Sequence, residues 1–175
     1  MKKIAVLLAF VLVSVAGFAQ EYIQQDEVYG FSRSIRTKAY PVIFNNDLYA
    51  IAFQYEKGLT EQLYYIMVAC THQPKQWQVK EKEIGAFRMV GGTNVYLEAI
   101  MPSNCEKTDD GYNIVASYRI PTENVHSMLD LLSLITINKK DLNSERASSI
   151  EIPIPYTAAD FLMSAYLELL TMTGK

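Results

Sequence analysis

This chain has few of the residues that metal binding and nucleophilic catalysis usually require. Its 175 residues include two cysteines, two histidines and one tryptophan. Cys70 and Cys105 belong to no CxxC pattern and have no neighbouring pair of histidines, so a metal site is not expected. The sequence also lacks a nucleophile elbow, a zinc-protease helix, a phosphate-binding loop and a dinucleotide fingerprint. We therefore predict no catalytic residue and no cofactor, and an enzyme is the less favoured class.

An excess of positive charge is also missing. The chain has 16 lysines and arginines against 19 acidic residues, a net charge of −3. Nucleic-acid binding depends on basic side chains that neutralise phosphates, and no basic stripe is present. Nucleic acid is therefore not an expected partner.

Long apolar runs are limited to the N-terminus. Lys2 and Lys3 precede an unbroken apolar run over residues 4–13, and the small residues Gly17 and Ala19 occupy positions −3 and −1 of a cut before Gln20. This pattern is typical of a secretory signal peptide over residues 1–19. An uncleaved anchor is the alternative, but the run is shorter than the ~20 residues of a spanning helix. We expect export to the periplasm or the cell exterior, with no transmembrane segment after cleavage.

The compartment bears on the two cysteines. Cleavage leaves 156 residues with a net charge of about −5, because Lys2 and Lys3 are removed. In an oxidising compartment a Cys70–Cys105 disulfide is one hypothesis. The alternative is a buried strand residue at Cys70 and a loop thiol at Cys105 that lies too far away. A nucleophilic pair of Cys70 with His72 would need a third, orienting group, and none is visible in the sequence.

The mature chain has mainly strand patterns. Residues 20–39 are expected to be a loose lead-in or an edge strand, and residues 40–175 a single β-rich domain. Within it, residues 63–71 are apolar on both faces, which indicates a central strand. Gly91 and Gly92 separate two strand-like segments and predict a hairpin, because glycine accepts positive φ at little cost.

The clearest local pattern covers residues 111–134. Alternating apolar residues from Tyr112 to Ile120 predict a strand, Pro121 ends it, and the spacing then changes from two to that of a helix near residues 123–132. A second helix is expected near residues 158–172. We predict an α+β, mainly β fold: an antiparallel, sandwich-like sheet of about seven to eight strands with these two helices.

The C-terminal helix has a narrow polar strip. Beyond its main apolar stripe it carries Met163, Leu167 and Leu170, and a helix that is apolar nearly all round requires cover on more than one side. Burial within the domain is one explanation. The other is a surface for a protein partner or for self-association, and an edge strand is a second candidate for such contacts.

Several segments support a family resemblance. The GFAQ junction at residues 17–20, the block VKEKEIGAFRMVGGTNVYLEA at residues 79–99 and YNIVASYRIPTENVHSML at residues 112–129 resemble small secreted β-rich proteins of Bacteroidota, which are known as uncharacterised families. The resemblance implies a periplasmic or extracellular location. It transfers no activity and no functional residue.

These observations favour a non-enzymatic binding or interaction module of the cell envelope. One alternative is a carbohydrate-binding module, because Trp77, Tyr64 and Tyr96 could stack on the apolar faces of a glycan. A row of exposed aromatic residues on one sheet face would favour that alternative, and their burial would count against it. The other is a hydrolase with no recognisable motif, which would need a polar pocket containing ionisable groups with shifted pKa values.

Overall fold

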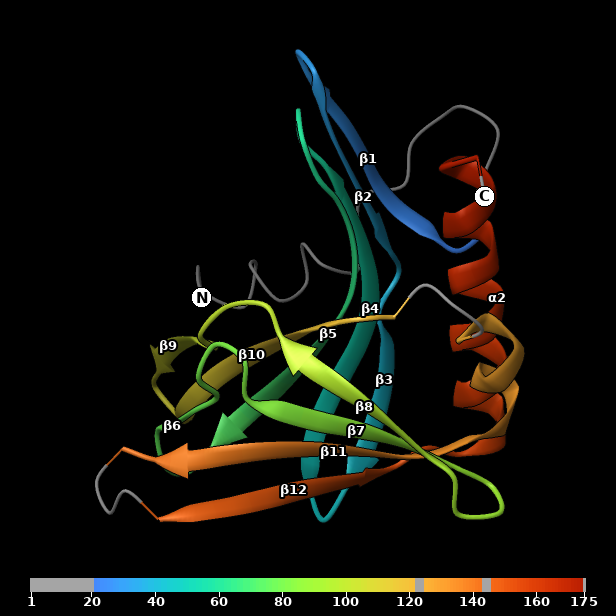
Figure 1. Cartoon of the computed structure of the whole chain (residues 1–175). Coiled ribbons are helices and arrows are strands. Elements are labelled where there is room, and N and C mark those ends of the chain that lie inside the picture. The colour runs from blue at the N-terminus through green and yellow to red at the C-terminus, as the bar shows by residue number, and fades with distance from the viewer. Residues whose placement is uncertain (1–20, 122–124, 143–145, 175) are drawn as a thin grey trace.

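The computed structural model describes residues 21–121, 125–142 and 146–174 (Figure 1). The expected signal peptide and the expected start of the first helix at residue 123 lie outside these ranges. Within them, twelve strands form one antiparallel sheet with the order β1-β2-β4-β5-β10-β8-β7-β11-β12. β3 pairs with β4, β6 with β11 and β9 with β10. The strands are β1 (Ile23–Tyr29), β2 (Ser32–Thr37), β3 (Tyr40–Phe44), β4 (Asp47–Lys57), β5 (Gln62–Gln73), β6 (Trp77–Gln78), β7 (Ile84–Met89), β8 (Asn94–Ala99), β9 (Asn104–Thr108), β10 (Gly111–Arg119), β11 (Leu132–Asp141) and β12 (Ala147–Pro153).

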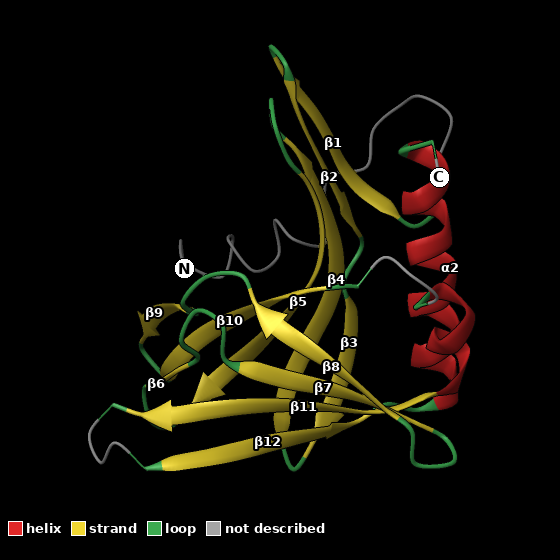
Figure 2. Cartoon of the chain, viewed as in Figure 1, coloured by secondary structure: helices red, strands yellow, loops and turns green. Residues whose placement is uncertain are grey.

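The sheet is strongly curved, and its inner face carries the core (Figures 1 and 2). Alternate residues of the strands point inward, as in β10, where Ile114, Ala116 and Tyr118 are fully buried. β5 lies between β4 and β10 in the middle of the sheet, as its two apolar faces predict. The expected mainly β fold is confirmed. The strand count is higher than predicted, and the sandwich is not confirmed because all strands belong to one hydrogen-bonded sheet.

The helix α2 (Tyr156–Met172) packs on the part of the sheet formed by β1–β4 and also contacts β11 (Figure 2). Its buried side includes Leu162, Tyr166 and Leu169, and the Tyr166 ring lies 5.0 Å from that of Phe53 on β4. The helix begins after Pro155, with no side-chain cap. Thr157 does not cap the helix, and its Oγ1 instead accepts a hydrogen bond from the Tyr40 hydroxyl.

The shorter helix was predicted as an α-helix and is a 3-10 helix, η1 (His126–Leu131). The spacing of Val125, Leu129 and Leu132 correctly places three buried residues on one side. Leu132 has extended backbone angles and begins β11, so the helix ends at Leu131.

Residues 20–39 were expected to be a loose lead-in or an edge strand. The structure supports the second alternative, because β1 and β2 form an antiparallel hairpin that extends the sheet, with one shift of register between Ile23 and Gln25 and with β1 as the outermost strand. β2 pairs with the C-terminal half of β4, while β3 pairs with its N-terminal half. The hairpin is therefore part of the same sheet as the rest of the domain.

Candidate functional site

Two turns extend together from one end of the molecule (Figure 1). The first joins β1 to β2, and the second joins β4 to β5. Arg33 pairs with Lys57 at the end of the β2–β4 ladder, so the two turns begin next to each other, with Phe31 two residues before Arg33 and Leu59 two residues after Lys57. Four large apolar side chains lie in or next to these turns and are hereafter named the arm tip. They are Val28 (66% exposed) and Tyr29 (68%) at the end of β1, Phe31 (83%) in the first turn and Leu59 (80%) in the second.

The β1–β2 hairpin, hereafter named the arm, is held in place below the arm tip by Arg33. Nε and Nη2 of Arg33 donate to the two carboxylate oxygens of Asp26 at 2.9 and 2.8 Å, an arrangement that joins β2 to β1. Nη1 of Arg33 also donates to the carbonyl oxygen of Met172 in the last turn of α2 at 3.2 Å. The hairpin is thus tied to the helix, and the tip is presented on a supported strand pair.

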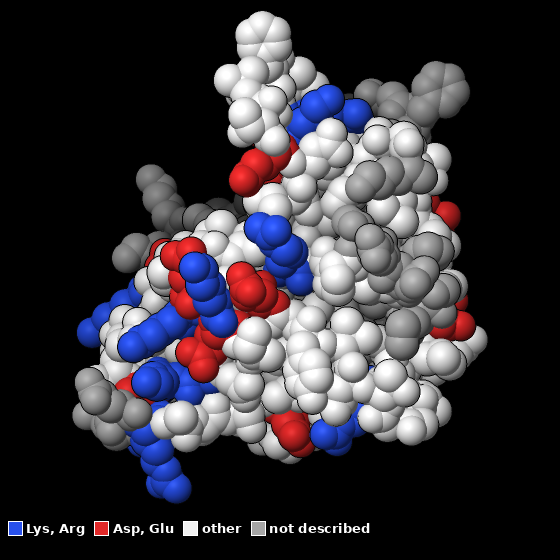
Figure 3. Space-filling model, in the orientation of Figure 1, with Lys and Arg blue, Asp and Glu red and all other residues white. Residues whose placement is uncertain are grey.

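The charge around the arm tip is negative. Residues 26–33 and 56–61 contain four acidic and two basic side chains. Hydrogen bonds from Gln25 and Tyr29 lower the pKa of Glu27, so this carboxylate next to the tip is ionised at neutral pH. In the space-filling view the projection at the top carries no charged residue, and charged side chains lie below it (Figure 3). The tip is therefore apolar, and the charged side chains below it are of both signs with an acidic excess.

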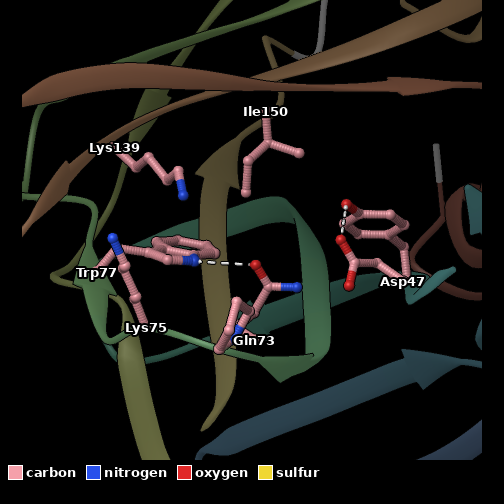
Figure 4. Close-up of a pocket in the computed structure, with 8 residues that line it drawn as sticks. Asp47, Gln73, Lys75, Trp77, Lys139 and Ile150 are labelled. Atoms are coloured by element: carbon pink, nitrogen blue, oxygen red, sulfur yellow. Dashed lines mark hydrogen bonds between the residues drawn. The ribbon is translucent and has the colours of Figure 1, made fainter. Parts of the chain in front are cut away.

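A second feature is a cavity of about 230 Å³ at another part of the molecule, where several inward-facing rows of side chains end (Figure 4). Asp47 begins the inward row of β4, and Lys139 follows Ile135 and Ile137 in the inward row of β11. The lining residues are Asp47, Tyr49, Gln73, Pro74, Lys75, Trp77, Lys139 and Ile150.

In the cavity, the ammonium group of Lys139 lies over the aromatic ring of Trp77. Nζ of Lys139 lies 5.1 Å from the centroid of the Trp77 ring, and the Trp77 indole N–H donates to Oε1 of Gln73 at 3.2 Å (Figure 4). Burial lowers the pKa of Lys139, and burial together with the nearby Asp47 raises the pKa of Tyr49. Among the described lining residues there is one carboxylate and no histidine, serine or cysteine. These residues therefore do not form a nucleophile activated by a general base.

The three aromatic residues predicted to stack on a glycan do not form a platform. Trp77 and Tyr64 are only 2% and 3% exposed, whereas Tyr96 is 69% exposed on β8. The Tyr64 hydroxyl donates to Oγ1 of Thr173 at 2.6 Å, and the Tyr64 ring contacts Tyr55 and Tyr166 in the core. Two of the three residues therefore have packing roles, which counts against the carbohydrate hypothesis.

The hypothesis of a disulfide is not supported, because Cys70 and Cys105 are both free thiols. Both residues pair with Ile114, Cys70 from β5 and Cys105 from β9, so β10 runs between them. Two strand spacings place their Cα atoms roughly 10 Å apart, beyond the ~7 Å that a disulfide spans. Burial raises the pKa of Cys70 to about 12, so its thiol is neutral at pH 7. This counts against a nucleophilic pair of Cys70 with His72.

The residues predicted as an interaction surface on α2 are mostly covered. Met163 and Leu170 are half-buried and pack against the core, and only Leu167 is exposed, at 41%. The arm and the sheet thus provide much of the second layer of cover that this helix requires.

Comparisons with protein-family models, with curated proteins and with solved structures each found no match to this chain. No helix in the described part of the chain is long and apolar enough to span a bilayer. The same residues include no group of three or more histidine, cysteine or acidic side chains that could hold a metal ion.

Neither feature was predicted from the sequence. The cavity residues come from four separate segments, and no local spacing brings them together. The exposed turn could have been found, because Val28, Tyr29 and Phe31 surround Gly30 in an otherwise polar stretch, and a turn that carries apolar residues instead of polar ones is unusual.

Proposed function

We propose that this protein is an exported, non-enzymatic binding module that uses the arm tip to contact a partner protein of the cell envelope. The observation that carries the proposal is the exposure of Val28, Tyr29, Phe31 and Leu59 together at the end of a braced arm. Soluble proteins seldom expose clustered large apolar side chains without a binding role. Tyrosine and phenylalanine are also among the residues enriched at protein interfaces.

Charge favours a protein partner over a membrane surface. Segments that bind anionic lipid headgroups are rich in lysine and arginine, whereas acidic side chains predominate around the arm tip. Contact between two copies through their tips would bring these acidic groups together, so self-association by this surface is disfavoured. The surface fits an apolar pocket with a basic rim on a different protein.

Site-specific photo-crosslinking tests this proposal. A photoreactive amino acid replaces Phe31 in one variant and Tyr96 in another, because both side chains are highly exposed but Tyr96 lies on β8, away from the arm. In cells of the source organism we expect residue 31 to crosslink one discrete envelope protein that residue 96 does not capture. Crosslinks from residue 31 mainly to lipid, or to a second copy of this chain, would contradict the proposal.

A further inference from the structure

We propose that the cavity between β4, β5, β11 and β12 binds a small organic carboxylate, with Lys139 as the principal group that holds the anion. This site is separate from the arm tip, and the inference does not depend on the proposed partner. It rests on the position of Lys139, on the balance of charges and donors in the cavity, and on the size and walls of the cavity (Figure 4).

Lys139 is a charged residue at the end of a core-facing row. Ile135 and Ile137, which precede it on the same side of β11, are 1% and 0% exposed, and Lys139 itself is half-buried. Within the described residues its ammonium group makes no hydrogen bond and no ion pair within 4.0 Å, and it lies 5.1 Å from the centroid of the Trp77 ring. A partly desolvated ammonium group is stabilised by an anion, and its three N–H donors require acceptors.

The other polar groups of the cavity also favour an anionic ligand. The lining of the cavity includes two lysines, Lys75 and Lys139, and one carboxylate, Asp47, and Asp141 outside the lining also attracts Lys139. Gln73 already accepts from Trp77 through Oε1 and donates to the carbonyl oxygen of Thr71, which leaves its second amide N–H available. The cavity therefore presents more donors than acceptors, and a ligand rich in acceptors complements it.

The size and walls of the cavity point to an organic anion. Its volume of about 230 Å³ is smaller than the ~300 Å³ at which pockets for drug-sized ligands begin. Trp77, which is 2% exposed, and the half-buried Ile150 form the apolar part of the lining beside the lysine, and a hydrocarbon chain can contact this part whereas a hydrated inorganic ion cannot. A carboxylate with a short hydrocarbon chain can contact both the ammonium group and the apolar walls.

Trp77 makes the test direct, because it is the one tryptophan of the chain and lies in the cavity wall. Purified mature protein is titrated with butyrate at constant ionic strength while the emission of Trp77 is recorded, and calorimetry measures the same binding independently. Butyramide, which has the same shape without the charge, is the matched control ligand. We expect a saturable change with butyrate, with a Kd on the order of 1 mM, and no saturable change with butyramide.

Two variants separate Lys139 from general charge effects. Lys139→Met keeps an unbranched side chain but removes the ammonium group, and we expect at least tenfold weaker butyrate binding. Lys140→Met is the matched control, because the next residue of β11 points to the opposite face, and here we expect a change of less than twofold. Ile150→Phe, which fills the cavity while retaining Lys139, should also weaken binding at least tenfold.

Four results would overturn the inference: no saturable response to butyrate, equal binding of butyramide, unchanged butyrate affinity in Lys139→Met, or tighter binding of inorganic phosphate than of butyrate. The last result would assign the cavity to an inorganic anion. None of these outcomes bears on the arm tip, so failure here and failure of the proposed function are distinguishable.

Discussion

At the scale of single residues, backbone geometry decides which glycines tolerate a side chain. Gly92 lies in the β7–β8 turn with a φ of +91°, and no atom lies within 4 Å of the position that a Cβ would occupy. A side chain there meets backbone strain but no steric clash. Gly58, in the β4–β5 turn, does not have a positive φ, and the nearest atom to its added Cβ is 4.0 Å away.

We predict that Gly92→Val lowers the free energy of unfolding by about 1–3 kcal/mol, because a β-branched residue is strained at positive φ. Gly58→Val is the matched control and should change it by less than about 0.5 kcal/mol. Urea denaturation of both variants measures these effects. Equal stability of the two variants would show that the turn adapts to the new residue without strain.

The separation of the cysteines by β10 gives a second prediction at this scale. Cys105→Ser should change the free energy of unfolding by less than about 0.5 kcal/mol, because Cys105 is half-buried and bonded to no other cysteine. Loss of a native disulfide would instead cost about 2–5 kcal/mol. Thiol titration of the unfolded, unreduced protein should find both cysteines free. A titration that finds neither would contradict the strand order around Ile114.

Lys139 links stability to pH. Its pKa in the folded state is lowered by burial and by Lys75, while Asp47, Asp141 and Cys70 act in the opposite direction. At pH values below both the folded-state and the unfolded-state pKa of Lys139, the charged lysine therefore lowers the stability of the fold. This cost disappears as the pH rises through the folded-state pKa toward the unfolded-state value. We predict that Lys139→Met raises the thermal midpoint at pH 7 in ligand-free buffer, and that the gain shrinks at pH 10. A constant gain at both pH values would assign the effect to packing instead of charge.

At the scale of elements, α2 has a buried side and an exposed side. Each side carries a leucine, so the effect of the same substitution on stability can be compared between them. Leu162 is fully buried, whereas Leu167 is 41% exposed. Leu162→Ala should lower the free energy of unfolding by about 2–5 kcal/mol through the lost contacts and the cavity left behind. Leu167→Ala should cost less than about 1 kcal/mol, because less of its apolar surface leaves water on folding. If Leu167→Ala were as costly as Leu162→Ala, the helix would be covered on its outer side as well.

Elements with a strong local period were predictable from the sequence. The alternation in β10, the glycine turn between β7 and β8 and the apolar pattern of α2 each come from neighbouring residues, and all three elements are present. Weakly apolar strands were not. β9 (Asn104–Thr108) has the polar sequence that is typical of a loop, yet it pairs with β10 along its length. Its strand conformation depends on a partner from elsewhere in the chain, which local propensity does not contain.

At the scale of the whole molecule, both candidate sites depend on contacts between segments that are distant in sequence. The arm tip joins two turns through the β2–β4 register, and the cavity joins β4 to β11 and β12 through the curvature of the sheet. The sequence predicted export and a binding role without the surface that would perform it. The predicted interaction surface on α2 stays a prediction: Met163 and Leu170 are partly buried against the core, and Leu167 is exposed.

The affinity of the arm tip for its crosslinked partner tests the central proposal most directly. The partner captured through residue 31 is purified, and its Kd is measured for the unchanged protein, for Phe31→Ser and for the matched control Tyr96→Ser. Because a few exposed aromatic residues carry most of the energy of an interface, we predict at least about tenfold weaker binding for Phe31→Ser and less than twofold for Tyr96→Ser. Equal Kd values for all three proteins would contradict a binding role for the arm tip.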